Sequence, residues 1–148
     1  MVGDSAPNFH LLTSKGEYVS LRDFRGKKNV VVYFYPKDFT MGCTAEACGF
    51  RDSYEEFKNL GAEVIGISGD SQGSHDAFAR EHKLPFILLS DPDGSVRRAY
   101  GVKKTLGLFA GRVSFVIDKD GIVRHVFSSQ ARATAHVDEA LTVLKSLS

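Results

Sequence analysis

Two apolar runs constrain the fold of this chain more than any other feature: VVVYFY over 30–35 and EVIGIS over 63–68. Continuous β-branched and aromatic runs of this length are typical of strands buried on both faces of a sheet. Between the two runs, apolar residues recur at steps of three and four, namely Ala47, Phe50, Tyr54 and Phe57. This spacing predicts an amphipathic helix over 44–60, which Gly61 ends. A buried strand, a helix and a second buried strand in that order predict a βαβ unit.

Shorter elements are predicted on both sides of this unit. Two strands, Phe9–Leu12 and Tyr18–Leu21, predict an N-terminal β-hairpin. The later elements are a helix over 74–82, a strand over 86–89, a short helix over 96–100, a hairpin of 112–117 with 123–127, and a closing helix over 134–147. This order, βαβ and then ββα, is similar to that of thioredoxin-like folds. We therefore predict an α/β protein, a three-layer α/β/α sandwich around a mixed central sheet, with residues 1–148 as a single domain.

Composition and charge exclude two classes of function. The net charge is +1 and basic residues form no long run, so a nucleic-acid surface is not indicated. No apolar stretch approaches the roughly 20 residues that a membrane span needs. The first residues, Met1–Asp4, lack the features of a signal peptide. We expect a cytoplasmic protein, with the plastid stroma or lumen as the alternative if a transit peptide has been removed.

The chain has two cysteines, Cys43 and Cys48. Two cysteines are too few for a disulfide scaffold, and in a reducing compartment such a pair is more often catalytic or metal-binding. The CxxC redox motif is absent. A zinc site needs about four ligands, whereas the histidines are scattered and none lies at HxxxH spacing with another. We therefore expect no metal and no cofactor, and we expect the histidines to be surface or capping residues: His10, His75, His82, His125 and His136.

Cys43 follows the buried strand and a loop over 36–42, and it opens the predicted helix. A helix N-terminus carries about half a positive charge and free N–H groups, which stabilise a thiolate. Cys43 is therefore a candidate nucleophile. The alternative is a small buried hydrophobic residue, since free cysteines are often buried.

Cys48 lies five residues further along the same predicted helix. Five helical steps rise about 7.5 Å and turn about 140°, which separates the two α-carbons by about 8.6 Å. A disulfide needs α-carbons within about 6.8 Å, so Cys43 and Cys48 cannot bond while the helix is intact. The spacing suits a helix that is complete when reduced and locally unfolded when oxidised, because a first helical turn opens easily. That Cys48 simply packs in the core is the alternative.

A resemblance to a known family is carried by Pro36, Thr40 and Cys43, which match the PxxxTxxC active-site motif of peroxiredoxins. Three longer segments resemble the peroxiredoxin Q subfamily, also called bacterioferritin comigratory protein: YFYPKDFTMGCTAEACGFRDSYEEF, VIGISGDSQGSHDAFAREHKLPFILLSD and GRVSFVIDKDG. The resemblance covers nearly the whole chain. The motif with a second cysteine five residues on is highly specific, unlike a lone CxxC.

The resemblance implies an atypical 2-Cys peroxiredoxin of the AhpC/TSA type, with a thioredoxin-like fold and without metal or cofactor. Such an enzyme reduces hydrogen peroxide and organic hydroperoxides. Cys43 would be the peroxidatic cysteine, whose thiolate attacks the peroxide and becomes sulfenic acid. Cys48 would resolve it as an intramolecular disulfide after local helix unwinding. Thioredoxin or a glutaredoxin-like dithiol donor would reduce that disulfide, and we expect a monomer, with a dimer as the alternative.

Further site residues follow from the resemblance. Arg112 matches the family's active-site arginine and would favour the thiolate and hold a peroxide oxygen. Thr40 offers a hydroxyl to the peroxide or the thiolate, and otherwise would cap the helix. Pro36 would shield Cys43, and otherwise would only end the strand. Glu46, one turn after Cys43, is expected to orient an arginine.

The chain departs from the family pattern beside the nucleophile. Many relatives have Asp-Thr-Pro-Gly-Cys or Glu-Thr-Pro-Gly-Cys here, whereas this chain has Phe39 and Met41 around Thr40. These apolar side chains lead to the hypothesis that bulky organic hydroperoxides are accepted well. The apolar segment 106–109 is expected to be buried, or else to border the pocket or a partner surface.

Two other functions remain open from the residues. A thiol-disulfide oxidoreductase acting on proteins would share the fold, although it would be expected to carry CxxC. A redox-sensing module would use the disulfide to unfold a helix and change a partner surface, without catalytic turnover.

Overall fold

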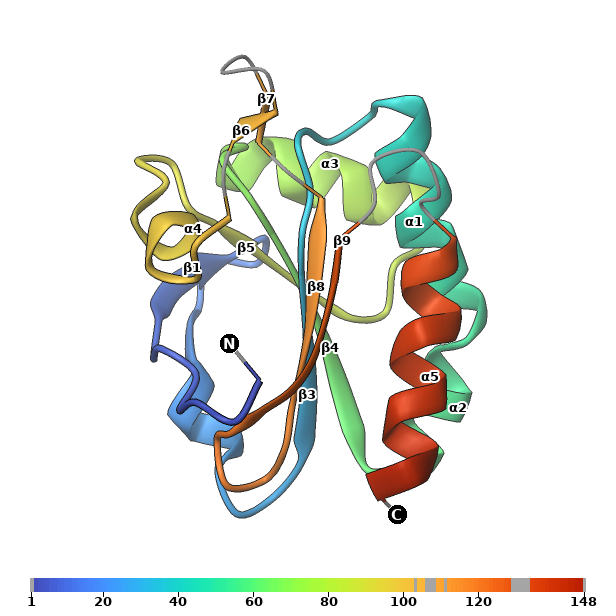
Figure 1. The fold of residues 1–148 in the computed structure, drawn as a ribbon. Helices are drawn as coiled ribbons and strands as arrows, with labels where there is room; N and C mark the ends of the chain where they lie inside the picture. Colours follow the sequence, from blue (N-terminus) through green and yellow to red (C-terminus); the bar gives the residue numbers. More distant parts are fainter. Residues whose placement is uncertain (1, 103, 106–108, 111, 129–133, 148) are drawn as a thin grey trace.

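The structure, a computed structural model, describes residues 2–102, 104–105, 109–110, 112–128 and 134–147. These residues form a seven-stranded sheet in the order β2-β1-β5-β4-β3-β8-β9 (Figure 1). Its strands are β1 (His10–Thr13), β2 (Tyr18–Ser20), β3 (Asn29–Phe34), β4 (Ala62–Ser68), β5 (Ile87–Ser90), β8 (Val113–Ile117) and β9 (Val123–Ser128). The helices are η1 (Leu21–Phe24), α1 (Met41–Asp52), α2 (Tyr54–Asn59), α3 (Gln72–His82), α4 (Ser95–Ala99) and α5 (Ala135–Leu147). Two further strands, β6 (Lys104–Thr105) and β7 (Phe109–Ala110), form a separate ribbon.

The sheet is mixed, as predicted. β3, β4 and β5 are parallel, and the first two of these are the apolar runs of the βαβ unit. β8 and β9 extend the sheet on one side and β1 and β2 on the other, all by antiparallel pairing. Every residue of β3 and β4 is buried, because both faces of the central strands are covered.

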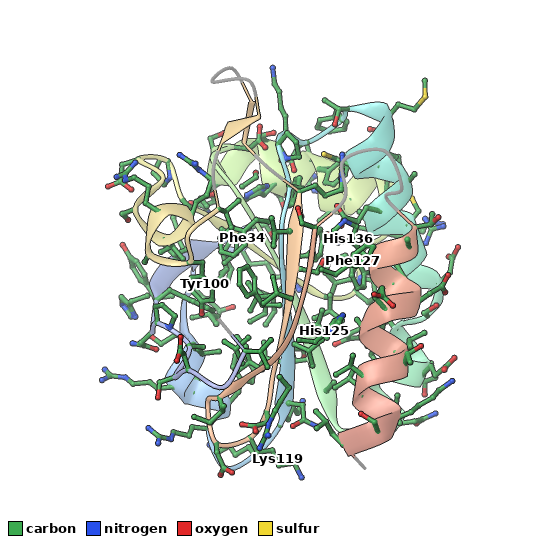
Figure 2. All side chains as sticks on the ribbon, in the orientation of Figure 1. Phe34, Tyr100, Lys119, His125, Phe127 and His136 are labelled. Atoms are coloured by element: carbon green, nitrogen blue, oxygen red, sulfur yellow. The ribbon has the colours of Figure 1, made fainter. Side chains whose placement is uncertain are left out.

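Two apolar layers enclose the sheet. On one face Val31 and Tyr33 pack with α1, α2, α3 and α5, whereas on the other face Val30, Val32 and Phe34 pack with η1, α4 and the N-terminal segment. Figure 1 shows α1, α2 and α5 together on one side of the sheet and α4 on the opposite side. In Figure 2, Phe34 and Tyr100 lie on the α4 side. The three-layer α/β/α arrangement is therefore confirmed.

The helix predicted over 44–60 is wrong in two respects. It begins at Met41, because Thr40 keeps an extended backbone with φ −81° and ψ 153°. It also breaks at Ser53, where φ −101° and ψ 4° separate α1 from α2. The apolar spacing showed only which positions are buried. Phe50 in α1 and Phe57 in α2 are both buried, so the spacing continues across the break at Ser53. Cys43, which was expected to open the helix, therefore lies inside the first turn of α1.

The other boundaries agree with the prediction to within one or two residues, including the N-terminal hairpin and the pair of β8 with β9. Residues 106–108 of the predicted apolar segment lie outside the described residues. None of the described helices is long and apolar enough to cross a membrane.

Candidate active site

Cys43 lies in the first turn of α1 and is almost fully buried, with 1% of its surface exposed. Its side chain belongs to the core cluster that α1 and α5 form over the sheet. The helix is twelve residues long, so its free N–H groups and dipole are directed at this turn. Cys43 therefore lies both at a helix N-terminus and in the core, so a thiolate here would be shielded from water.

Arg112 reaches the same place from the other half of the chain. Phe34, the last residue of β3, pairs with Val113, the first residue of β8. Arg112 therefore lies beside the end of β3, where the loop that leads to Cys43 begins. This pairing explains why a residue 69 positions away in the sequence joins the site.

The guanidinium of Arg112 is held against Cys43 by Glu46. Nη1 of Arg112 donates a hydrogen bond of 2.6 Å to Oε1 of Glu46, and the arginine is only 5% exposed. Burial opposes a charged guanidinium, but attraction and hydrogen bonding by Glu46 and Cys43 outweigh it and raise the pKa of Arg112. The site thus keeps a positive charge at the sulfur, and the contact expected between Glu46 and an arginine is present.

Glu46 is itself fully buried, and its second oxygen has few partners. Burial raises the pKa of Glu46 to about 8, although Arg112 acts in the opposite direction. Oε2 accepts no hydrogen bond from the described residues and lies 3.7 Å from Nδ1 of His136. That same Nδ1 lies 2.6 Å from Oγ of Ser114. His136 also packs edge-on against Phe127, between the sheet and α5 (Figure 2).

The expectation that the histidines are surface or capping residues is wrong for His136 and His75. Both are 0% exposed. Nδ1 of each ring is hydrogen bonded inside the core to a side chain of a distant segment, Asp38 for His75 and Ser114 for His136. Sequence spacing could not show this, because the partners come from other elements.

His75 anchors the loop that precedes Cys43. Its Nδ1 lies 2.7 Å from Oδ2 of Asp38, a residue inside the PxxxTxxC segment. The hydroxyl groups of Tyr35 and Ser74 donate to the two oxygens of the same carboxylate, at 2.6 Å and 2.9 Å. The backbone N–H of Asp38 donates to Asp70. The loop is thus tied to α3 by buried hydrogen bonds that the sequence analysis missed.

One group of residues has side chains of the kinds that bind metal ions: Asp38, Asp70 and His75. Their potential ligand atoms lie within 4.8 Å of one another. All three residues are engaged in the hydrogen bonds that hold the loop. This network gives each of them a role without an ion.

Thr40 and Pro36 lie on the segment between β3 and α1 that leads to Cys43. Thr40 is exposed at the N-cap position of α1, and its hydroxyl donates to the carbonyl of Lys37 at 2.9 Å. Because the hydroxyl proton of Thr40 points to the loop, the hydroxyl oxygen can still accept a hydrogen bond from a substrate. Pro36 is half-buried and lines a hollow of about 230 Å³ at the ends of β3 and β4, which is separate from Cys43 because Cys43, Thr40 and Arg112 are not among its lining residues. Phe39 and Met41 on either side of Thr40 are 48% and 90% exposed.

Cys48 lies on the same unbroken helix as Cys43, and both cysteines are free. Its side chain is half-buried, and its Sγ lies 3.9 Å from Nδ1 of His82 at the end of α3. The two sulfurs therefore have different surroundings: Cys43 is in the core beside Arg112, and Cys48 is in the seam between α1 and α3.

Comparisons with known proteins show which proteins this chain is similar to. Residues 2–126 match the model of the AhpC/TSA family. Peroxiredoxin Q of Sedum lineare, a chloroplastic protein, is 53% identical over 146 residues, which are 98% of this chain and 78% of that protein. Among solved structures, peroxidoxin BcpB of Mycobacterium tuberculosis is similar with a TM-score of 0.92 and 37% identity, covering 99% of this chain and 97% of that one. Bacterioferritin comigratory protein of Xanthomonas campestris, described for its alkyl peroxide reduction activity, has a TM-score of 0.86 and 32% identity, covering 94% and 91%.

Proposed function

The chain belongs to the AhpC/TSA family and is a peroxiredoxin, a peroxidase that takes peroxides as substrates and a thiol as reductant, and we propose that Cys43 is its peroxidatic nucleophile. The observation that supports this most strongly is the Arg112–Glu46 pair at 2.6 Å, which holds a charged guanidinium beside a cysteine at a helix N-terminus. Positive charge and free N–H groups are what O–O cleavage requires.

In the proposed first step, the Cys43 thiolate attacks one oxygen of the peroxide. A sulfur–oxygen bond forms and the oxygen–oxygen bond breaks, so the sulfur is oxidised to sulfenic acid and the peroxide is reduced. The departing alkoxide or hydroxide takes up a proton. Arg112 and the N–H groups of Gly42 and Cys43 stabilise the charge that develops on both oxygens, and Pro36 and Thr40 shape the entrance.

In the proposed second step, Cys48 resolves the sulfenic acid. Its thiolate attacks the Cys43 sulfur, a disulfide forms, and hydroxide leaves and becomes water. The two cysteines occupy one continuous helix in the structure, so the first turns of α1 have to unwind before they can meet. Thioredoxin or a glutaredoxin-like dithiol then reduces the disulfide.

The substrate range that we propose is hydrogen peroxide together with organic hydroperoxides. The described activity of the Xanthomonas campestris protein on alkyl peroxides supports this range. The exposed Phe39 and Met41 beside Thr40 support it further, since they give the entrance an apolar rim.

We further propose that residues 1–148 act as one domain and as a monomer. The chloroplastic plant relatives favour the plastid alternative for the location of this chain over the cytoplasm. Imaging of the tagged full-length protein in its own cells tests the location, and a cytosolic signal would contradict it.

The function is tested by NADPH consumption with thioredoxin and thioredoxin reductase after hydrogen peroxide is added. We expect turnover for the unaltered protein and none for Cys43→Ser. Cys48→Ser should consume one peroxide per chain and then stop, because its sulfenic acid is not resolved.

This assay tests each part of the proposed mechanism separately. If Cys43→Ser still turns over peroxide, Cys43 is excluded as the nucleophile. If Cys48→Ser shows full turnover, Cys48 is excluded as the resolving residue. If the unaltered protein oxidises once and is not recycled, the thioredoxin step is wrong and a redox-sensing role gains support.

A further inference from the structure

The resolving thiol has a basic side chain directly beside it. Sγ of Cys48 lies 3.9 Å from Nδ1 of His82, which is hydrogen-bonding distance for the large sulfur atom. Both side chains are half-buried, in the seam between α1 and the end of α3. In the tautomer protonated at Nε2, the Nδ1 atom accepts the proton of the thiol.

His82 is held in this place from two directions. Nη1 of Arg51, on the same helix as Cys48, donates to the carbonyl oxygen of His82 at 2.8 Å. The His82 ring packs edge-on against Phe78, with ring centres 5.2 Å apart. Phe39 lies against the same ring at 6.4 Å. The imidazole is therefore positioned at the sulfur by backbone bonding and aromatic packing.

A cationic side chain lies close to this pair. Arg51 is close enough for Cys48 to raise its pKa, although the main cause of that rise is the hydrogen bond of Arg51 to Asp52. Arg51 on α1 contacts His82 and is paired with Asp52, while α3 and the loop contribute the aromatic rings of Phe78 and Phe39. A cation next to a thiol stabilises its ionised form.

Resolution depends on this ionised form. Only a thiolate attacks the sulfur of a sulfenic acid, and a thiol without a basic neighbour is mostly protonated at neutral pH. Imidazole is the side chain that exchanges a proton readily in this range. Cys48 lies in the second turn of α1, further from the free N–H groups that surround Cys43, so it needs another source of activation.

We propose that His82 is a catalytic base for the resolving step, a role that rests on the proposed function of Cys43 and Cys48. Nδ1 takes the proton from Cys48, and the thiolate attacks the sulfur of the Cys43 sulfenic acid. The sulfur–sulfur bond forms, the sulfur–oxygen bond breaks, and the leaving hydroxide takes up a proton to become water. The bond from Arg51 to His82 keeps the Cys48 end of α1 against α3, so the N-terminal turns that contain Cys43 are the part that unwinds and brings the sulfenic acid to Cys48.

The test is a single-turnover experiment on reduced protein with one equivalent of hydrogen peroxide. Samples are quenched with acid over time, and mass spectrometry separates thiol, sulfenic acid and disulfide. The rate of sulfenic acid formation reports on Cys43, and the rate of its conversion to disulfide reports on Cys48. The variants are His82→Phe, which keeps a ring against Phe78, and His82→Gln. The matched control is His10→Phe, an exposed histidine that is stacked on Tyr18 at the β1–β2 end of the sheet.

We expect both His82 variants to form sulfenic acid at the unaltered rate and to close the disulfide at least about tenfold more slowly near pH 7. The difference should shrink to less than about threefold at pH 9, where a thiol ionises without help. With excess peroxide, the longer-lived sulfenic acid of the variants should also yield more sulfinic acid at Cys43. His10→Phe should match the unaltered protein in every measurement.

Two results would overturn this role of His82. Closure at the unaltered rate would show that His82 takes no part in it. Faster closure would show that His82 only stabilises the helical form of α1. If the unaltered protein forms no sulfenic acid on Cys43, the proposed function itself fails and the role of His82 fails with it.

Discussion

The α-carbon of Gly42 faces the guanidinium of Arg112 so closely that a β-carbon added to Gly42 would lie 2.9 Å from Nη2. Real β-carbons essentially never approach a neighbour this closely. The neighbour here is fixed, because Arg112 is buried and bonded to Glu46. Arg112 can therefore occupy the space beside Cys43 only because Gly42 has no side chain.

Gly42→Ala should displace Arg112 from Cys43. We expect the second-order rate constant for reaction with hydrogen peroxide to fall by about tenfold or more, since the guanidinium no longer stabilises the developing charge. Stopped-flow competition for peroxide measures this rate. Gly73→Ala in α3 is the control, because its added β-carbon would meet only Oγ of Ser71 at 3.9 Å. Equal rates in Gly42→Ala and the unaltered protein would show that the position of Arg112 is unimportant.

The pKa of Glu46 predicts a pH-dependent stability. Burial raises this pKa from 4.5 to about 8, so between these values the folded protein keeps a proton that the unfolded chain has released. The resulting stabilisation is complete below about pH 4.5 and is lost as the pH rises through 8. In Glu46→Gln the amide cannot lose a proton. We expect the free energy of unfolding of the unaltered protein to fall relative to Glu46→Gln by about 2–4 kcal/mol between pH 5 and pH 8.

Urea denaturation at several pH values measures this difference. Glu55→Gln on the exposed side of α2 is the control and should show no such trend. A constant difference between Glu46→Gln and the unaltered protein across the range would mean that Glu46 stays ionised in the folded state.

The buried carboxylate of Asp38 should contribute strongly to stability. It accepts hydrogen bonds from Tyr35 and Ser74 and is paired with His75. Asp38→Asn replaces one accepting oxygen by a donor, so we expect a loss of about 2–4 kcal/mol in the free energy of unfolding. Asp52→Asn, which changes an exposed side chain paired with Arg51, should change the free energy of unfolding by less than about 1 kcal/mol. Similar values for the two variants would exclude Asp38 as an anchor of the loop.

Met41→Pro should stabilise the protein and alter its peroxide preference. Met41 is the first residue of α1, where proline is favoured, and Thr40 before it already has the extended backbone that a following proline requires. We expect a gain of about 0.4–1 kcal/mol in the free energy of unfolding. Because the exposed Met41 side chain is lost, the ratio of rate constants for cumene hydroperoxide and hydrogen peroxide should decrease.

Urea denaturation and peroxide competition measure these two effects independently. An unchanged ratio would end the hypothesis of an apolar entrance, even if stability rises as expected.

The sequence was sufficient for the fold wherever an element has a regular pattern. The strands β3 and β4, the helix between them and the β8–β9 hairpin all follow from apolar periodicity and turn residues. The break at Ser53 was not predicted, since the buried positions continue at helical spacing across it. Boundaries and interruptions depend on backbone angles, and periodicity does not record these.

Residue types and local spacing alone identified Cys43 and Cys48 as candidate redox residues, showed that they cannot bond within a helix, and showed that Pro36, Thr40 and Cys43 match a known motif. These properties are local, because they depend on neighbours within a few positions of the chain. Tertiary structure decided the contacts of the buried and half-buried histidines: His75 with Asp38, His136 beside Glu46 and His82 beside Cys48. It also brings Arg112 to Cys43, an arginine to which the family resemblance had already pointed. The pairing of β3 with β8 and the packing of α1 against its neighbours bring these side chains together. No spacing along the chain encodes those contacts, because they arise from how separate elements are arranged around a common core.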